Sequence, residues 1–332
     1  MKLSVIVATR NRAHAIRPCL DSIATAFAKA APLDAEIVVV NNGSSDNTME
    51  IITAWAAATT VSVQLLQEPM AGVTRARNHA LRFARGQLLA FTDDDCRLHP
   101  QYVNDLLRYD GEDRGLVLRG GRIELGDPTD LPLTINTSPT RIRWTRSINS
   151  ARHHWIPGFL HGCNMVMRRA LLDQIGLFDE AFGPGSYIGS GEDSDLMFRA
   201  YLAGATLEYV PDMTVFHYHG RKTPEAGRKL MRRYTMANGA MLARYQFTHP
   251  DLCRVFYQDL RHAVRSLISG RNTLAPEIHF SNTDMVVYSA LGFIKYTLMR
   301  KHSLPLLRNE RLKASSEAHY HSITTHTRHS EL

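Results

Sequence analysis

Three consecutive aspartates, Asp93, Asp94 and Asp95, follow the apolar run Leu88–Phe91 and are the first candidates for chemistry in this sequence of 332 residues. Adjacent carboxylates repel one another, so a fold that gathers them needs a positive charge close by. Mg²⁺ and Mn²⁺ prefer carboxylate oxygens and often share their shell with substrate phosphates. An exposed acidic turn is the alternative. Because the preceding run is typical of a buried strand, we favour a divalent cation site.

A second acidic group, Glu192, Asp193 and Asp195, follows the glycine-rich segment 183–191 (GPGSYIGSG). A positioned carboxylate can take a proton from a hydroxyl, which contributes about 10²–10⁴-fold to a rate. Acids are also favoured in the first turn of a helix, so capping is the alternative. Different acids can take the two roles. The glycine-rich segment could supply a flexible loop beside them.

Strands and helices alternate in the first 95 residues, which predicts an α/β fold with a mostly parallel sheet between helices. Ligands bind such sheets beyond the carboxyl ends of the strands. The polar segments 9–12, 41–46 and 93–95 lie at those ends. The predicted strands are Leu3–Ala8, Glu36–Val40, Val61–Leu66 and Leu88–Phe91, and the predicted helices are Ala13–Ala31, Met49–Ala58 and about 73–84.

The sequence also predicts how the chain divides into domains. We expect a catalytic domain over 1–220 with halves 1–118 and 119–220, a basic helical extension over 221–314, and a disordered tail over 315–332. Within the domain we expect an irregular segment at 120–160, short helices at 169–175 and from 192 to about 203, and a strand at 207–210.

Composition and charge exclude several protein classes. Apolar residues make up 44% and charged residues 21%, which is typical of globular proteins rather than disordered or fibrous ones. Residues 221–332 hold 18 Lys and Arg against 8 Asp and Glu, a net charge of +10. Such an excess favours an anionic neighbour, or it is a solvated helical face. No recognition motif for nucleic acid accompanies it, so we expect no nucleic-acid partner.

An apolar stripe with helical spacing lies in the same extension. It consists of Val287, Leu291, Ile294 and Leu298. A basic amphipathic helix can lie in a membrane interface, so peripheral membrane contact through 221–314 is one interpretation. Packing of the stripe on the catalytic domain is the other.

Neither a spanning helix nor a signal peptide is predicted. The longest apolar stretch, Met285–Met299, is shorter than the roughly 20 residues needed to cross a bilayer. The first residues turn polar too early for a secretory signal. The four cysteines are widely spaced, which favours a reducing, cytoplasmic compartment.

Six segments, in this order along the chain, resemble the motifs of the family 2 glycosyltransferases, which have the GT-A fold. The segments are SVIVATRNRA, EIVVVNNGSSDNT, GVTRARNHAL, LLAFTDDDC, GCNMVMRRALLDQIGLFDEAF and GSGEDSDLMFRAYLAGATLEYVPDMTVFHYHG. The resemblance covers roughly residues 1–220. It implies a Rossmann-like domain and a metal-dependent, inverting transfer of a sugar from a nucleotide-diphosphate donor. The implied acceptor is a hydroxyl of a glycan or lipid-linked molecule in surface polysaccharide or glycolipid synthesis. Together with the cytoplasmic compartment that the cysteines favour, this makes the inner face of the membrane one candidate location.

The resemblance also implies roles for single residues on the donor side. Thr9 and Asn41 would flank the base, and Arg77 would lie near the nucleotide or diphosphate. His217 would lie near the metal or diphosphate, with a buried structural histidine as the alternative. The family usually has Asp where this chain has Asn41, and an amide can donate as well as accept. UDP is therefore favoured, while GDP and a deoxythymidine diphosphate stay open.

The acidic residues receive the remaining roles. Asp93 and Asp95 would be the two named positions of the DxD motif, reaching ribose, diphosphate and a Mn²⁺ or Mg²⁺ ion, and Asp94 could share either task. Asp193 would be the general base, and Glu192 beside it would shape the acceptor pocket.

Two other functions share some of these features. A sugar nucleotidyltransferase also needs metal carboxylates on an α/β sheet, but it normally has a glycine-rich phosphate loop near its N-terminus, and ATRNRA contains no glycine. A non-catalytic nucleotide-sugar-binding scaffold is the other alternative. Retention of Asp93, Asp95 and Asp193 disfavours it.

Overall fold

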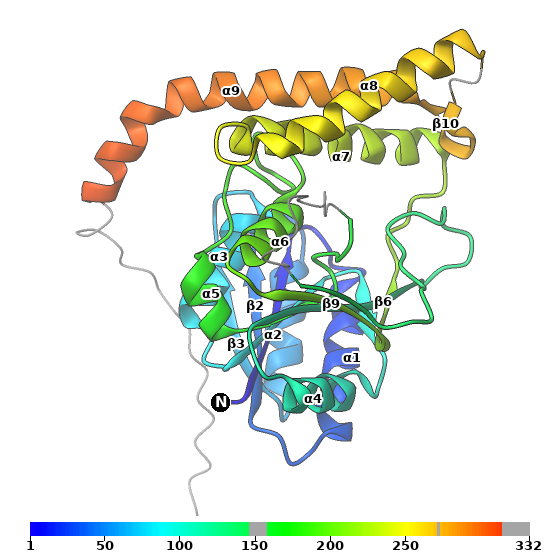
Figure 1. Ribbon diagram of the computed structural model, residues 1–332. Helices are drawn as coiled ribbons and strands as arrows, with labels where there is room; N and C mark the ends of the chain where they lie inside the picture. Colours follow the sequence, from blue (N-terminus) through cyan, green and yellow to red (C-terminus); the bar gives the residue numbers. More distant parts are fainter. Residues whose placement is uncertain (146–157, 271–272, 314–332) are drawn as a thin grey trace, which may run out of the picture.

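Within the described residues, a nine-stranded mixed sheet with helices on both faces forms the body of the protein, and a layer of helices covers one end (Figure 1). The computed structural model describes residues 1–145, 158–270 and 273–313. The strands are β1 (Leu3–Thr9), β2 (Ala35–Asn41), β3 (Ser62–Gln67), β4 (Leu88–Asp93), β5 (Cys96–Leu98), β6 (Val117–Leu125), β7 (Ile142–Trp144), β8 (Met165–Arg168), β9 (Thr206–His217), β10 (Thr273–Ala275) and β11 (Phe280–Ser281). The helices are α1 (Ile16–Lys29), α2 (Thr48–Ala58), α3 (Val73–Phe83), α4 (Tyr102–Glu112), α5 (Arg169–Ile175), α6 (Glu192–Leu202), α7 (Pro224–Tyr245), α8 (Cys253–Ile268) and α9 (Asn282–Lys313), with 3-10 turns η1 (Pro250–Leu252) and η2 (Pro276–Ile278).

The sheet has the strand order β3-β2-β1-β4-β8-β6-β9-β5, with β7 paired to β9. Strands β3, β2, β1 and β4 are parallel, as are β6 and β9, whereas β8, β5 and β7 run antiparallel to their neighbours. The predicted α/β fold with a mostly parallel sheet is therefore confirmed. Thr9 pairs with Asn41 and Ala8 with Asp93, so the ends of β1, β2 and β4 meet at one edge.

The core lies on both faces of this sheet, because side chains alternate along each strand. Val5 and Val7 of β1 pack with α1, α2 and α4, while Ile6 between them packs on the opposite face with α3, α5 and α6. A strand buried on both faces reads as a continuous apolar run. This is why the first strands were predictable within a residue or two of their ends.

The expectation of an irregular segment at 120–160 is wrong for its first part. Gly120 and Gly121 lie inside β6. Glycine is needed at position 121 because a Cβ atom there would lie 1.9 Å from the carbonyl oxygen of Met213 on β9. The glycine pair therefore lets β6 and β9 approach closely; it does not form a turn. Strand β9 is also longer than expected, and Pro211 lies where its register with β6 shifts. Residues 146–157 of the expected segment lie outside the described residues.

The C-terminal part is helical, as expected, with a small β10–β11 hairpin. Helix α7 begins after Thr223, whose side chain accepts a hydrogen bond from the amide of Ala226, with Pro224 in the first turn. Among the described helices, none combines the length and the apolar character needed to cross a bilayer. All four cysteines are free. The segment 315–332, for which we predict a disordered tail, lies outside the described residues.

Candidate active site

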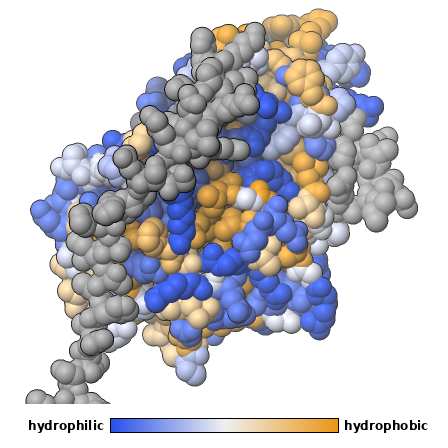
Figure 2. Space-filling model, turned by 90° about the vertical axis from the view of Figure 1, so that its left-hand side faces the viewer, coloured by the Kyte–Doolittle hydropathy of each residue, from blue (hydrophilic) through white to orange (hydrophobic). Residues whose placement is uncertain are grey.

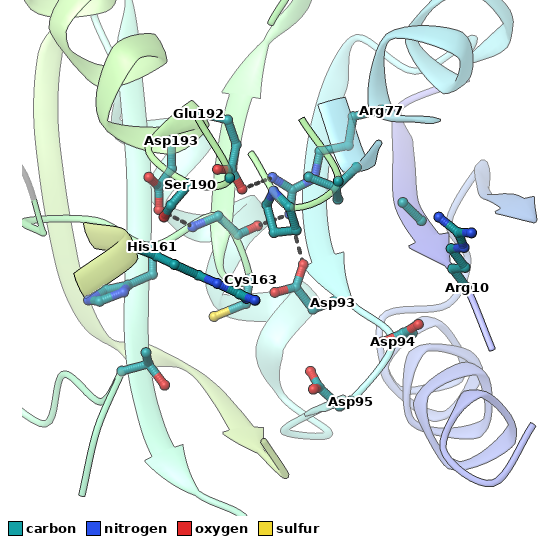
Figure 3. A pocket seen from close by; sticks show the side chains of 18 of the residues that line it. Arg10, Arg77, Asp93, Asp94, Asp95, His161, Cys163, Ser190, Glu192 and Asp193 are labelled. Atoms are coloured by element: carbon teal, nitrogen blue, oxygen red, sulfur yellow. Dashed lines mark hydrogen bonds and ion pairs between the residues drawn. The ribbon is translucent and has the colours of Figure 1, made fainter. Parts of the chain in front are cut away.

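A cavity of about 410 Å³ opens at the carboxyl edge of the sheet. Its walls come from the ends of β1, β4 and β9, from α3 and α7, and from the start of α6. A cavity of this size is typical of a small-molecule site. It contains most of the candidate residues, and Figure 3 shows the two acidic groups entering it from different segments.

Asp93, Asp95 and His217 form one group in this cavity. Strand pairing brings them together, because Cys96, which follows the aspartates, lies opposite His217 in the β5–β9 ladder. One possible ligand atom from each of the three lies within 4.8 Å of the others. Nε2 of His217 is 3.3 Å from Oδ1 of Asp95.

The charges of this group are strongly coupled. Burial opposes protonation of His217, but the hydrogen bond to Asp95 raises its pKa to about 9. Burial alone would raise the pKa of Asp95, yet the hydrogen bond and charge of His217 lower it. A protonated His217 is therefore the positive partner of Asp95. A bound divalent cation would take over that role, and His217 would then bind it as a neutral imidazole.

Asp94 faces a different partner. Its Oδ1 lies 3.5 Å from Nε of Arg12, while Nη2 of Arg12 donates to Oδ2 of Asp95 at 3.3 Å. Burial and the charge of Asp95 raise the pKa of Asp94 to about 7. Figure 3 shows Asp94 turned away from the side chain of Asp93. The three aspartates therefore do not act as equivalent ligands.

The donor set at Asp93, Asp95 and His217 fits a divalent cation such as Mn²⁺ or Mg²⁺. Two carboxylates and an imidazole suit a hard or borderline ion that keeps open positions for other ligands. Ligand atoms of Cys96, Cys163 and His217 also lie within 4.8 Å of one another. Thiolates favour softer ions, so the carboxylate set is the better match for Mn²⁺ or Mg²⁺.

The second acidic group lies at the start of α6. Gly191 precedes the helix with a positive φ of 90°, which suits glycine. Oδ2 of Asp193 accepts a hydrogen bond from the amide of Gly162 at 3.2 Å, and Oδ1 accepts one from the amide of Ser194 at 2.7 Å. Burial and the charge of Asp193 raise the pKa of Glu192 to about 7.

Arg77 connects the two acidic groups. Its side chain is 3% exposed. The guanidinium Nη2 donates a hydrogen bond to Oδ1 of Asp93 at 2.8 Å, and Nη1 lies 3.6 Å from Oε1 of Glu192 (Figure 3). Nη2 also donates to the carbonyl of Gly162 at 3.2 Å. Nη1 makes no hydrogen bond within the described residues, so Glu192 interacts with it as an ion pair only.

Asp195, the third acid of the second group, is structural. It is fully buried and accepts hydrogen bonds from Arg199 at 2.8 Å and from Tyr245 at 2.7 Å. Nε of Arg244 lies 3.1 Å from it. Asp195 therefore attaches α6 to α7, while Glu192 and Asp193 remain at the cavity.

The two residues expected at the base are placed differently. Thr9 lines the cavity, but Asn41 does not; its side chain accepts a hydrogen bond from the amide of Ser44 at 3.3 Å. The next residue, Asn42, does line the cavity and accepts from the amide of Gly72 at 2.8 Å. The turn after β2 therefore brings Asn42 to the wall.

Several cavity residues have no counterpart among the predicted site residues. Burial lowers the pKa of His161, although the charge of Asp193 opposes this. His161 directly precedes the GCN segment, and that position was its only sequence signal. The unexpected lining residues also include the basic and aromatic side chains Arg10, Arg12, Arg221, Arg233 and Tyr234.

Comparison with known proteins agrees with this architecture. The family model described as Glycosyl transferase family 2 matches residues 4–176, more than half of the chain. The succinoglycan biosynthesis protein ExoU of Rhizobium meliloti (strain 1021) is 30% identical over 218 residues, which cover 62% of this chain and 58% of ExoU. The chain spans about three fifths of the length of the curated relatives that it matches over more than 200 residues.

Solved structures share the fold at low identity. TarS of S. aureus, residues 1–349 in complex with UDP-GlcNAc, is 20% identical with a TM-score of 0.52, covering 90% of this chain and 92% of that one. Mannosyltransferase PcManGT from Pyrobaculum calidifontis, in complex with GDP-Man and Mn²⁺, is 16% identical with a TM-score of 0.50, covering 95% and 81%. The chain therefore belongs to glycosyltransferase family 2, and its fold is the GT-A fold.

Proposed function

We propose that this chain is a metal-dependent, inverting glycosyltransferase. It would move a sugar from a nucleotide-diphosphate donor to a hydroxyl of a glycan or lipid-linked acceptor, in polysaccharide or glycolipid synthesis. The observation that carries the proposal is that Arg77 joins Asp93 to Glu192 inside one cavity. Family membership and the similarity to a succinoglycan biosynthesis protein support it.

On the donor side, Asp93, Asp95 and His217 would hold Mn²⁺ or Mg²⁺. Such an ion supplies Lewis-acid stabilisation of the charge that develops on the leaving diphosphate. Arg77 contributes a fixed positive charge beside Asp93, which would attract the anionic diphosphate. Asp94 would keep its ion pair with Arg12 and so position the loop between β1 and α1.

On the acceptor side, Asp193 is the proposed general base. Its two backbone hydrogen bonds fix the carboxylate at the cavity wall, across from Asp94 and Asp95 in Figure 3. A base on one side and the diphosphate group on the other is the arrangement that in-line attack with inversion requires. Glu192 would shape the acceptor pocket through its contact with Arg77.

We propose that the donor is a UDP-sugar, with Thr9 and the turn at Asn41 and Asn42 beside the uracil base. The TarS structure holds UDP-GlcNAc, whereas the PcManGT structure holds GDP-Man, so related folds accept both bases. A cytoplasmic location completes the proposal, and free cysteines in the described structure are consistent with it.

Thermal unfolding with a panel of nucleotides tests this function. UDP, GDP, CDP, dTDP and ADP are each added with and without Mn²⁺, because a ligand of the folded state raises the melting temperature. We expect one diphosphate to give a metal-dependent shift that Asp95→Ala abolishes. Absence of a shift with every nucleotide, in folded protein, would contradict the proposed donor site.

A further inference from the structure

Helix α8 exposes an apolar stripe. Tyr257, Leu260, Val264, Leu267 and Ile268 are 41–81% exposed. With 100° between successive residues of a helix, these five side chains fall within about 100° of one face. The buried side of α8 adjoins the edge of the stripe formed by Leu260 and Leu267: Ala263 is 5% exposed, and Phe256 packs on the hydrophobic core between α7 and α9. The stripe is therefore the outer face of a docked amphipathic helix.

Helix α9 carries a second apolar stripe on its outer side. Val287, Leu291, Ile294 and Leu298 are 46–52% exposed, so about half of each side chain is open to solvent. Gly292 lies on the opposite face of the helix, where a Cβ atom would lie 1.9 Å from a backbone oxygen of α7. Helices α8 and α9 pack against each other, which places both stripes on one helical layer.

Arginines accompany the apolar stripe of α8. Arg254, Arg261 and Arg265 are exposed and project within about 40° of one another along one edge of the stripe. The guanidinium of Arg261 lies 5.9 Å from the ring centroid of Tyr257. The whole segment 221–332 has a net charge of +10. The surface therefore combines apolar side chains with a row of positive charge.

This surface lies on the far side of α7 from the cavity. Leu230, Arg233 and Tyr234 of α7 line the cavity, whereas Gly239 on its opposite face contacts α9. Figure 1 shows the helical layer above the sheet, and Figure 2 shows hydrophobic side chains at the upper end of the molecule, over that layer. A planar partner could cover this surface without covering the cavity.

We propose that the outer surface of α8 and α9 docks on an anionic lipid membrane. Partly buried apolar side chains and arginines at the headgroup level are the two attractions that hold an interfacial helix. A second copy of the chain fits this surface less well, because pairing would bring the same arginines together. The docking itself is independent of the proposed activity; only the link to a lipid-borne acceptor rests on that function.

Vesicle sedimentation of the full chain tests the docking. The vesicles contain phosphatidylcholine alone or with about 30% phosphatidylglycerol, at low and high salt. We expect binding to the anionic vesicles that weakens with salt. The double variant Val264→Asp/Ile268→Asp should lose at least about tenfold in partitioning. Arg261→Gln/Arg265→Gln should lose about tenfold on anionic vesicles and little on neutral ones.

Leu177→Asp is the matched control, because Leu177 is an exposed leucine of the catalytic domain. It should bind vesicles as the unchanged chain does. The nucleotide-induced thermal shift, measured on the same proteins, reports on the proposed function separately and should persist in the α8 variants. Failure of the unchanged chain to bind anionic vesicles would overturn the docking. So would a change from dimer to monomer in the α8 variants without a loss of vesicle binding.

Discussion

Nη2 of Arg77 donates a 2.8 Å hydrogen bond to Oδ1 of Asp93, which ties helix α3 to the end of β4 inside the cavity. Arg77→Lys keeps the charge but cannot contact Asp93, Glu192 and the carbonyl of Gly162 together. We expect a loss of about 1–3 kcal/mol in the free energy of unfolding, measured in urea. We also expect weaker nucleotide binding by calorimetry.

Arg75→Lys is the control for this prediction. Arg75 lies on the same helix, is 37% exposed and pairs with Glu180 at 3.4 Å. An exposed pair of this kind contributes about 0–1 kcal/mol, so the variant should stay close to the unchanged protein. Equal losses in both variants would contradict the connecting role of Arg77.

Asp193→Asn tests the general base. The amide keeps the size of the side chain but cannot take the proton of the acceptor hydroxyl, so we expect transfer to fall by about 10²–10⁴-fold. Nucleotide binding should be retained, because the donor side is unchanged. Product formation with a radiolabelled donor measures the first quantity and calorimetry the second. Asp173→Asn, at an exposed position on α5, should transfer normally; transfer by Asp193→Asn at a near-normal rate would exclude Asp193 as the base.

Glu192→Gln tests the electrostatic cost of the second acidic group. The folded-state pKa of Glu192, about 7, lies above its ordinary value of 4.5. Between these values the folded chain holds a proton that the unfolded chain releases, so this residue's contribution to stability falls as the pH rises from about 4.5 to 7. Without metal or nucleotide, the variant should be more stable than the unchanged protein at pH 8, on the order of 1–3 kcal/mol.

At about pH 4.5 the two proteins should have similar stability, because Glu192 is then largely neutral in the folded state. Urea unfolding at both pH values measures the difference. Glu50→Gln on α2 is the control, since its side chain is exposed and stays hydrated in the folded state. A constant difference between Glu192→Gln and the unchanged protein at both pH values would refute the explanation.

Gly239→Ala tests the contact between α7 and α9. A Cβ atom at Gly239 would lie 1.8 Å from the carbonyl oxygen of Ser289, so the helices must separate. We expect a loss of about 1–3 kcal/mol or more in thermal or urea unfolding. Gly111→Ala on α4 meets nothing within 4 Å and should gain up to about 1 kcal/mol from helix propensity. A neutral Gly239→Ala would show that the two helices are not in close contact.

The elements that could be predicted from the sequence are those marked by a local pattern of apolar residues. The runs at β1, β2 and β4 are apolar throughout because both faces of these strands are buried. Their common edge then followed from the rule for parallel sheets, and the cavity containing Thr9, Asp93 and Asp193 lies there.

What could not be predicted depends on residues far apart in the chain. Gly121 reads as a turn residue until Met213 on β9 is placed against it. Asp195 and Asp193 have the same chemistry and differ only in their neighbours, because Tyr245 from α7 reaches Asp195. The arginine beside Asp94 comes from a loop 82 residues earlier, and nothing in its local sequence marks it.

The close glycine contacts between α7 and α9 set the distance between the cavity and the outer surface of α9. Packed helices lie about 8–10 Å apart and closer where glycines meet, so the wall formed by Tyr234 stands about 15–20 Å beneath the outer surface of α9. With α9 on a bilayer, a hydroxyl at the lipid headgroup would be too near the membrane to enter the cavity. Under the proposed docking, a lipid-linked acceptor would therefore have to carry its hydroxyl across this distance to reach the cavity.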